Sequence, residues 1–500
     1  MKSLALSFLS ALLLVFSFPP FDVGLLAWVA FIPFFFALEG KSLRQAFWIS
    51  YAAGFLFFLG LLHWVHYVTW AGTIVLVLYL SLYFALFGAG IRFLNTRGRF
   101  VWIPSLWVVL EFVRSFLFTG FGWGLLAYSQ WKYLSLIQFS ELTGAYGVSF
   151  LVMFGNVLFF RVLQRDLKTR KKTILVVIFF LVLGVLFAYG FFYPPEFFST
   201  DAYFRASVIQ GNIPQDLKWD PSVQDLILKK YETLTRAVSE NHPDAIFWPE
   251  TAVPGFLPDE APLWDRLTVL SRDSQTYLLV GTPWNEEGWA YNSALFLEKG
   301  EILQRYDKLH LVPFGEFIPF EKNFPKLRDW IETGDFHPGE EFTLFKHPKG
   351  NFATLICFED IFPDLVRRFA KESDFLVNLT NDAWFMKSSA PFQHAQASVF
   401  RAIENRRSVL RVTNTGFTCL IDPMGRILRR LEIGGEPLFV TGYQTWDIPL
   451  SKEETFYTLH GDLFAWACVI VILLGTVSSV IKWKSRGSHM WVSKAPLAEG

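Results

Sequence analysis

The sequence predicts an α-helical membrane domain of about eight transmembrane helices and a separate, layered α/β domain. The 500 residues are 52% hydrophobic and only 18% charged, which is too apolar for a chain made of water-soluble domains alone. Apolar residues form long blocks at the start of the chain and one more near its end. We therefore expect a membrane domain over residues 1–193, a globular domain over 194–455, a last transmembrane helix within 456–484 and a polar tail over 485–500.

Eight apolar segments approach the roughly 20 residues that a helix needs to cross a bilayer. They lie near residues 4–19, 22–38, 46–62, 73–94, 101–118, 136–160, 173–193 and 461–481. The first segment is short enough to be a cleaved signal peptide. However, no small-x-small cleavage site follows it, and Pro19-Pro20 leads directly into the next apolar run. We therefore expect this segment to remain as a transmembrane helix.

Positive charge predicts the orientation of these helices. With eight spans, the following basic residues all fall on one side: Lys2, Lys41, Arg44, Arg97, Arg99, Arg161, Arg165, Lys168, Arg170, Lys171, Lys172, Lys482, Lys484 and Arg486. By the positive-inside rule that side is cytoplasmic, together with both termini, and the globular domain is extracytoplasmic. Because 45 basic residues balance 45 acidic ones and no basic stripe is present, we expect no nucleic-acid partner.

The globular region alternates apolar, strand-like runs with helical patterns. Strand-like runs are FRASVIQGN, DAIFWPE, TYLLVGTPW, YNSALFL, FATLICF, DFLVNLTN and SVLRVTNTGFTCLI. Residues 222–240 carry apolar side chains at helical spacing, and residues 391–407 form a second helix candidate. This pattern indicates an α/β domain with buried sheets, but the spacing leaves open whether the sheets form a doubly wound fold or a sandwich.

Three residues at the ends of predicted strands form a candidate acyl-transfer site. Cys357 follows an apolar strand in LICFED, Glu250 ends another in WPETAVP, and Lys308 lies between them in YDKLHLVPFGEF. A free thiol is mostly protonated at pH 7, so a nearby base such as Glu250 is needed to form the nucleophile. An ammonium group such as that of Lys308 would stabilise the oxyanion that forms when the thiolate attacks a carbonyl.

The alternative for Cys357 is a buried, unreactive cysteine, since lone cysteines are often small core residues. Three cysteines, of which Cys468 lies in the last apolar segment and Cys419 in a strand-like run, do not form a disulfide framework. A carboxylate and a lysine, each at the end of a predicted strand, are the partners that a catalytic cysteine would need, and the family resemblance of their order decides for the catalytic interpretation.

The order Glu250, Lys308, Cys357 resembles the Glu-Lys-Cys triad of the nitrilase, or carbon–nitrogen hydrolase, superfamily. Three more motifs, QGN at 210–212, LVPFGEF at 311–317 and NDAWF at 381–385, extend the similarity. With the apolar spans, they resemble the apolipoprotein N-acyltransferase family from about residue 1 to 484. The resemblance implies an α-β-β-α sandwich for the globular domain and a bacterial inner-membrane location with the catalytic domain on the periplasmic side.

The resemblance also suggests residues that support the triad, each with a plainer alternative. Glu316 is expected near the site, or else in a structural salt bridge. Glu359 either supports the site or caps the helix that follows it. Asn292 and Asn381 lie near the site in the family, although buried strand-end asparagines often satisfy backbone groups instead. Phe358 stands where relatives often carry tyrosine, so only its backbone N–H is available to an oxyanion.

Aromatic residues in predicted loops are candidates for lipid or substrate contact, or for core packing. They are Trp219, Phe314, Phe317, Trp384 and Phe385. Within the fifth apolar segment, Glu111 and Arg114 are one helical turn apart. Because charges inside a membrane are costly, we expect these two to pair with each other or to face a polar cavity.

The resemblance implies a two-step acyl transfer. Cys357 would take an acyl chain from a glycerophospholipid and pass it to the α-amino group of a diacylglyceryl-cysteine at the amino terminus of an apolipoprotein. One alternative is a membrane-anchored amidase in which water resolves the thioester. Another is a transporter or scaffold with an inactive sandwich, which the loss of a triad residue would favour, and none is lost. We expect neither a metal nor a cofactor, because the sequence has no zinc pattern, phosphate loop or dinucleotide fingerprint. In the tail, GSHM resembles an expression-vector scar, so residues 485–500 are expected to play no part in function.

Overall fold

The computed structural model describes residues 1–94, 99–164, 168–192, 202–319, 321–323, 325–329 and 334–492, without the side chains of residues 99, 327 and 480–492. The predicted boundary at residue 193 and the end of the tail beyond residue 492 lie outside the described residues. Arg97 and Arg165, two of the basic residues used to predict the orientation, lie outside them as well.

The chain divides into two compact units. The helical unit contains Met1–Lys132, Ala145–Ala188 and Asp462–Gly500, and the sandwich unit contains Tyr133–Gly144 and Tyr189–Gly461. The predicted globular region thus belongs to one unit, which also includes a short segment from within the sixth predicted span.

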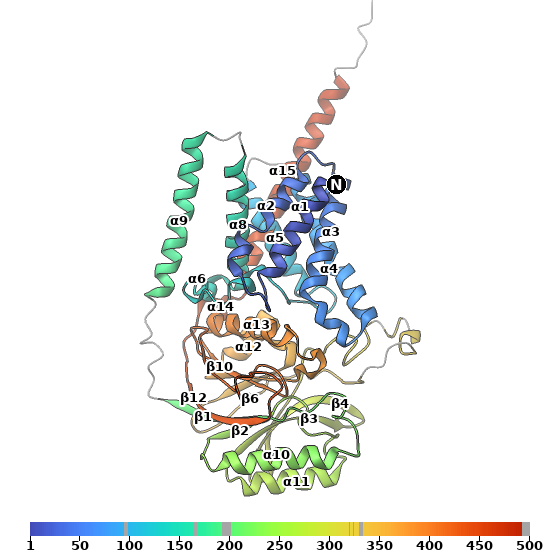
Figure 1. The fold of residues 1–500 in the computed structure, drawn as a ribbon, viewed down its shortest axis with the longest axis vertical. Helices are drawn as coiled ribbons and strands as arrows, with labels where there is room; N and C mark the ends of the chain where they lie inside the picture. The colour runs from blue at the N-terminus through green and yellow to red at the C-terminus, as the bar shows by residue number, and fades with distance from the viewer. Residues whose placement is uncertain are drawn as a thin grey trace, which may run out of the picture. The chain divides into compact units, whose positions relative to one another are not determined.

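Helices occupy the apolar segments of the helical unit (Figure 1). They are α1 Lys2–Phe16, α2 Phe31–Leu38, α3 Leu43–Leu61, α4 Trp70–Phe93, α5 Arg99–Arg114, α8 Ala145–Leu163, α9 Thr169–Phe191 and α15 Leu463–Val492. By length and composition, α4, α8 and α9 are each able to cross a membrane. The number of eight spans remains a prediction.

Two predicted spans are interrupted. Residues 22–38 contain a 3-10 helix, Gly24–Trp28, before α2 begins at Phe31. Residues 136–160 contain the short helices α6, Leu134–Ile137, and α7, Ser140–Thr143, and the long helix begins only at Ala145. Gly144 separates α7 from α8 at φ +64, and a Cβ there would lie 2.7 Å from the Tyr457 ring. A continuous helix would therefore require a different conformation at this glycine.

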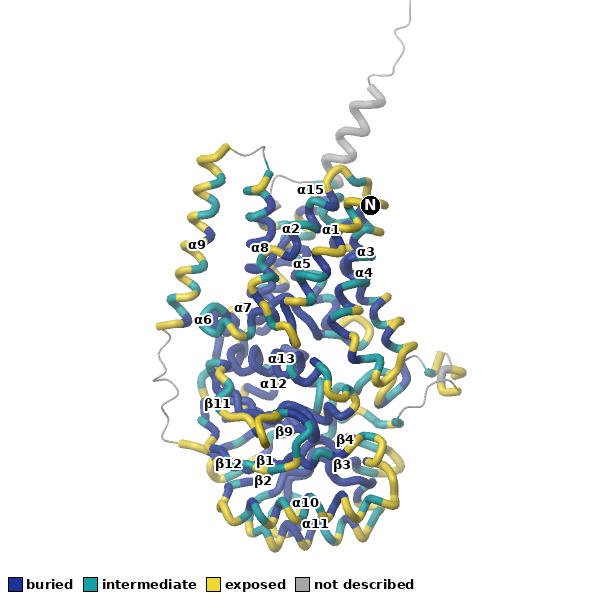
Figure 2. Tube along the Cα trace, in the orientation of Figure 1, coloured by how far each residue is buried: buried dark blue, intermediate teal, exposed yellow. Residues whose placement is uncertain are grey.

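Aromatic rings and small residues pack the helical unit. Phe31 contacts the rings of Phe84, Phe87 and Trp107, at centroid distances of 4.8–6.1 Å. Helices α3 and α4 approach closely at Gly88, where a Cβ would lie only 1.8 Å from Ser50 Oγ. In contrast, α9 exposes most of its apolar side chains, while α8 is largely buried (Figure 2). An exposed apolar helix is the surface expected of a segment that contacts lipid.

The sandwich unit contains two six-stranded sheets. Their orders are β12-β1-β2-β3-β4-β5 and β11-β10-β9-β8-β7-β6. The strands of the first sheet are β1 Tyr203–Gln210, β2 Ala245–Phe247, β3 Tyr277–Glu286, β4 Trp289–Glu298, β5 Glu301–Asp307 and β12 Gly442–Pro449. Those of the second are β6 Leu344–Phe345, β7 Phe352–Ile356, β8 Phe375–Thr380, β9 Ser408–Thr413, β10 Cys419–Ile421 and β11 Ile427–Arg430.

Helices cover the outer face of each sheet. Helices α10, Gln224–Ser239, and α11, Ala261–Asp273, pack against the first sheet; α12, Pro363–Ala370, and α13, Ala390–Asn405, pack against the second (Figure 1). Between the sheets, Phe204 packs against the rings of Phe247, Phe352 and Phe375. The predicted α-β-β-α sandwich is confirmed, and α10 and α13 lie within two residues of the two predicted helices.

Parallel pairing brings the carboxyl ends of several strands to one edge of each sheet. Strands β1, β2 and β3 are parallel in the first sheet, and β7, β8 and β9 are parallel in the second. Because functional groups in α/β folds collect at the carboxyl ends of parallel strands, these edges are where a site is expected. Glu250 follows β2 and Cys357 follows β7.

Candidate active site

The three predicted catalytic residues each follow a strand directly or within a few residues. Cys357 is the first residue after β7 and has φ +55, a left-handed conformation that is uncommon for a residue with a side chain. Its carbonyl oxygen accepts a hydrogen bond from Asn378 Nδ2 at 2.8 Å, which fixes the turn. Lys308 is the first residue after β5, and its backbone N–H donates to the Asn292 carbonyl at 2.9 Å.

Lys308 lies between two carboxylates. Its Nζ is 3.4 Å from Glu250 Oε1 and 2.9 Å from Glu316 Oε1. Asn292 Nδ2 donates to the same two oxygen atoms, at 2.8 Å and 2.7 Å. Val312 N–H donates to the other oxygen of Glu316 at 2.7 Å. The lysine is 1% exposed, so this cluster is closed to bulk water on that side.

The charge of Lys308 is fixed by its neighbours. Burial acts to lower the pKa of Lys308, but the carboxylates of Glu316 and Glu250 outweigh it and raise the pKa above its ordinary value. The side chain is therefore a cation throughout the physiological pH range. A permanent cation beside a nucleophile is the arrangement required for oxyanion stabilisation.

Burial and neighbouring charges shift the pKa of the Cys357 thiol. Burial and the negative charge of Glu250 raise the pKa of the Cys357 thiol well above its usual value, while the positive charge of Lys308 acts in the opposite direction. The residue itself is partly exposed, whereas Cys419 and Cys468 are buried. A protonated thiol near a carboxylate requires that carboxylate as a base before it becomes nucleophilic.

Glu359 connects the loop after Lys308 to the end of β7. Its Oε1 accepts from the backbone N–H groups of Leu309, at 2.8 Å, and His310, at 3.0 Å. Its Oε2 accepts from Ile356 N–H at 2.7 Å, and the Tyr306 hydroxyl donates to the same carboxylate. Burial raises the pKa of Glu359 to about 7. The carboxylate thus ties the loop after Lys308 to the start of the 3-10 helix Cys357–Ile361, of which Glu359 is a part. It does not cap the helix that follows, since the N-cap of α12 is Phe362, with no side-chain hydrogen bond.

The other predicted residues lie at different distances from this cluster. Phe358 places its ring centroid 5.5 Å from Lys308 Nζ, within the range of a cation–π contact. Asn381 instead bridges two loops, since its Nδ2 donates to Gln215 at 2.8 Å and its Oδ1 accepts from Asn414 at 2.9 Å. Asn292 contacts the carboxylates directly, whereas these two partners of Asn381 are side chains, not the backbone groups of its plainer alternative.

The predicted aromatic contact residues differ in exposure. Trp219, Phe314 and Trp384 are 41%, 49% and 47% exposed, and Phe317 and Phe385 are partly buried. Trp219 stacks on Phe256 at a centroid distance of 6.3 Å. The three exposed rings are therefore available to a ligand, whereas the other two also contribute to packing.

Lys218 is a site residue that the sequence did not reveal. It is 3% exposed, and its Nζ donates to the Glu250 carbonyl at 3.1 Å. Burial lowers the pKa of Lys218 to about 8, although the charges of Glu250 and Cys357 favour the protonated form. It lies outside the motifs that carry the family resemblance. A second lysine near Glu250 can be identified only once the fold brings the loop after β1 next to the end of β2.

Comparisons with known proteins agree with this arrangement. Residues 10–158 match the family described as Apolipoprotein N-acyltransferase N-terminal domain, and residues 205–453 match Carbon-nitrogen hydrolase. An apolipoprotein N-acyltransferase of Geobacter metallireducens is 40% identical, with 92% of each chain covered. The chain belongs to the apolipoprotein N-acyltransferase family. A second family member, from Chlorobaculum tepidum, is 30% identical over 96% of this chain and 97% of its own.

Family membership makes the chain an acyltransferase and sets aside the amidase alternative. Among solved structures, an amidase from Nesterenkonia sp. covers 51% of this chain and 93% of its own, at 20% identity and a TM-score of 0.39.

Proposed function

We propose that the sandwich unit transfers an acyl chain from a glycerophospholipid to an apolipoprotein through a thioester on Cys357. The acceptor is the α-amino group of the diacylglyceryl-cysteine at the amino terminus of the apolipoprotein. One observation carries this proposal: a buried, charge-fixed Lys308 lies 3.4 Å from Glu250, and both act electrostatically on the Cys357 thiol. Family membership supports the choice of acyl transfer to an amine.

In the first step, Glu250 accepts the thiol proton as the Cys357 sulfur attacks the ester carbonyl of the phospholipid. Lys308 stabilises the negative charge that develops on the carbonyl oxygen. The C–O ester bond then breaks, and the lysophospholipid leaves with the proton that Glu250 returns. The acyl chain remains on the enzyme as a thioester.

In the second step, the α-amino group of the acceptor attacks the thioester. Glu250 takes the amine proton, the C–S bond breaks, and the sulfur of Cys357 recovers a proton from Glu250. The products are an amide-linked acyl chain and the resting thiol, so no co-reactant is needed. Glu316 and Asn292 hold Lys308 and Glu250 in place through both steps.

The proposal includes the eight-span topology, with both termini in the cytoplasm and the sandwich unit on the periplasmic side of a bacterial inner membrane. Two observations support it: the basic residues gather on one predicted side, and α9 exposes a mostly apolar surface. A membrane location suits the substrates, because pulling an acyl chain of about 15 methylenes into water costs roughly 12 kcal/mol.

The test is the intact mass of the protein after incubation with phosphatidylethanolamine. The wild-type protein is expected to gain one acyl group, Cys357→Ser to gain none, and the matched control Cys419→Ser to gain one, since Cys419 is buried in β10. Adding a diacylglyceryl peptide should then release the acyl group from the wild-type protein. An adduct that persists in Cys357→Ser would disprove the assignment of the nucleophile.

A further inference from the structure

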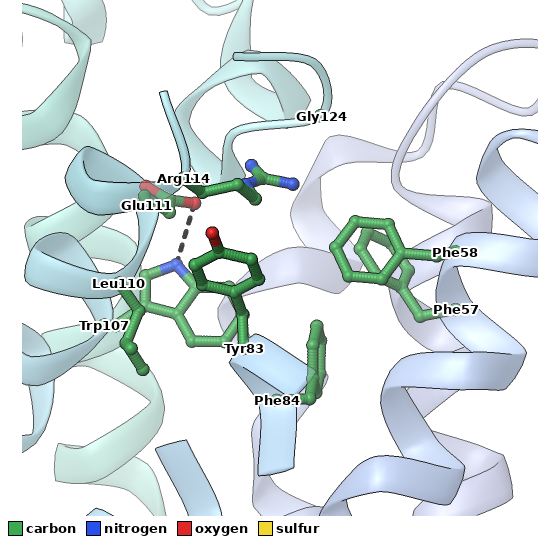
Figure 3. Close-up of a pocket in the computed structure, with 9 residues that line it drawn as sticks. All are labelled: Phe57, Phe58, Tyr83, Phe84, Trp107, Leu110, Glu111, Arg114 and Gly124. Atoms are coloured by element: carbon green, nitrogen blue, oxygen red, sulfur yellow. Dashed lines mark hydrogen bonds between the residues drawn. The ribbon is translucent and has the colours of Figure 1, made fainter. Parts of the chain in front are cut away.

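A small cavity in the helical unit contains a buried cation. It lies among α3, α4, α5 and Gly124, and Glu111 and Arg114 of α5 both face it (Figure 3). The remaining walls are mainly aromatic: Phe57, Phe58, Tyr83, Phe84 and Trp107. The sequence predicts that Glu111 and Arg114 pair with each other or face a polar cavity; both face this cavity, but its walls are mainly aromatic rather than polar.

The carboxylate of Glu111 accepts hydrogen bonds from α5 and from the segment that follows it. Its Oε1 accepts from Trp107 Nε1 at 2.8 Å and from the Leu126 N–H at 2.7 Å. These bonds direct the carboxylate toward Trp107, while the guanidinium of Arg114 points the other way, toward Phe58 and Gly124 (Figure 3). The two side chains interact electrostatically but form no salt bridge in the part of the chain that the structure describes.

Arg114 is 3% exposed, and within the described residues its Nη1 has no hydrogen-bond partner. Its guanidinium lies over the Phe58 ring, with Cζ 5.4 Å from the ring centroid. Buried guanidinium groups normally satisfy their N–H donors, because an unpaired buried charge costs several kcal/mol. A charged residue within a membrane segment whose N–H donors are not all satisfied therefore indicates a ligand or partner that accepts hydrogen bonds from it.

The volume of the cavity limits which part of a ligand can enter it. Its volume is about 20 Å³, and roughly 10–15 Å³ suffice for one water molecule. One or two oxygen atoms fit, whereas an acyl chain does not. Guanidinium groups prefer the oxygen atoms of phosphate and carboxylate groups. In the proposed orientation, Arg114 is at the extracytoplasmic end of α5, where the phosphates of the outer leaflet lie.

We infer that Arg114 binds an anionic phosphodiester oxygen of a glycerophospholipid whose acyl chains remain outside the cavity, against the apolar helices. This site is a lipid-positioning site that deepens the proposed function, because it holds the headgroup of the donor class. Free phosphate has the same chemistry, so the experiment separates the two sources.

The experiment measures lipid binding without turnover. Full-length protein carrying Cys357→Ala is purified in detergent, and native mass spectrometry follows binding of dioleoylphosphatidylglycerol, dioleoylglycerol and inorganic phosphate. Arg114→Gln is expected to weaken phosphatidylglycerol binding by roughly 10- to 100-fold, the range of a lost charge-assisted hydrogen bond. Dioleoylglycerol, which lacks the phosphate, should bind the unchanged Arg114 protein weakly and be insensitive to the substitution.

Two variants serve as controls. Arg44→Gln removes an exposed arginine near the start of α3 and should leave binding unchanged. Arg114→Lys keeps the positive charge and should retain most of the affinity, which keeps the inference testable if Arg114→Gln does not fold.

Equal phosphatidylglycerol binding by folded Arg114→Gln and the parent protein would overturn the inference. The inference would also be overturned if inorganic phosphate bound at Arg114 while Arg114→Gln left phosphatidylglycerol binding unchanged. Because this experiment measures binding and not turnover, a negative result would contradict the lipid site but not the proposed acyl transfer. Conversely, the absence of an acyl adduct on Cys357 would contradict the acyl transfer but not the lipid site.

Discussion

At the scale of single residues, two charged neighbours act on the thiol of Cys357, the proposed nucleophile. Glu250 raises the pKa of the thiol and Lys308 lowers it, so the two neighbours act in opposite directions on the same proton. In the proposed mechanism Glu250 therefore has two effects, since its charge disfavours the thiolate and its carboxylate accepts the thiol proton.

Substitution of these two neighbours should separate their roles. Glu250→Gln removes the base, so acyl-enzyme formation at pH 7 is expected to fall by roughly 10²–10⁴-fold. The loss of the carboxylate also lowers the pKa of the thiol, so activity should partly recover as the pH rises and the thiolate forms unaided. Lys308→Met should reduce acylation by roughly 10²–10³-fold without comparable recovery in alkali, because no change of pH replaces the missing cation.

The measurement is the rate of acyl-enzyme formation against pH, together with the rate of thiol alkylation against pH. The alkylation midpoint should move to lower pH in Glu250→Gln and to higher pH in Lys308→Met, with the wild-type protein as the reference. Melting temperatures show whether each variant is folded. Equal recovery of both variants in alkali would mean that the two residues do not have the proposed separate roles.

The motifs predicted this part of the molecule well, but not completely. Glu250, Glu316 and Lys308 are found together as expected, because each lies at or near the end of a strand. Lys218 was missed since a single lysine in a loop has no periodicity or spacing that distinguishes it. Its position depends on contacts between segments 32 residues apart, as its bond to the Glu250 carbonyl shows.

At the scale of elements, the segment Tyr133–Gly144 is the clearest departure from the sequence prediction. Hydropathy places most of it within an apolar span, yet it belongs to the sandwich unit. Arg406 donates from Nε to Glu141 at 2.6 Å and from Nη1 to Gln138 at 2.6 Å. Tyr189 also donates to Glu141. Hydropathy averaged over a window of residues does not detect a single buried carboxylate such as Glu141. Its partner, Arg406, lies 265 residues further along the chain.

The Glu141–Arg406 pair should matter strongly for stability. Its side chains are 7% and 0% exposed, so removing either partner leaves a buried charge uncompensated. Glu141→Gln and Arg406→Met are each expected to cost about 3–5 kcal/mol of unfolding free energy, and the double variant less than their sum. Denaturant unfolding of the detergent-solubilised protein provides the measurement.

The matched control is Arg236→Gln, which breaks the exposed Arg236–Asp273 pair of the same unit, with side chains 54% and 46% exposed. That change should cost at most about 1 kcal/mol. If the buried and exposed pairs proved equally dispensable, Tyr133–Gly144 would not be held to the sandwich unit through this contact.

At the scale of the whole molecule, composition and order of segments predicted two units, a helical one and an α/β one. The sandwich type came from family resemblance, because strand and helix periodicity alone fits more than one α/β arrangement. Span boundaries were less well predicted, since turns at residues such as Gly144 depend on tertiary contacts. The outcome for Glu111 was open for the same reason: its partner Leu126 lies beyond the reach of helical spacing.

The orientation of the two units relative to the membrane can be tested with single cysteines. In a background with Cys357→Ser, whose other cysteines are buried, Lys299→Cys places a thiol in the sandwich unit, where the lysine side chain is 81% exposed. Arg44→Cys places one at an exposed position near the start of α3. A maleimide too polar to cross the inner membrane is added to cells with a permeabilised outer membrane. Because the positive-inside rule puts Arg44 in the cytoplasm and the sandwich unit outside it, Lys299→Cys should react directly. Arg44→Cys should react only after the inner membrane is opened, and the opposite order of labelling would reverse the proposed topology.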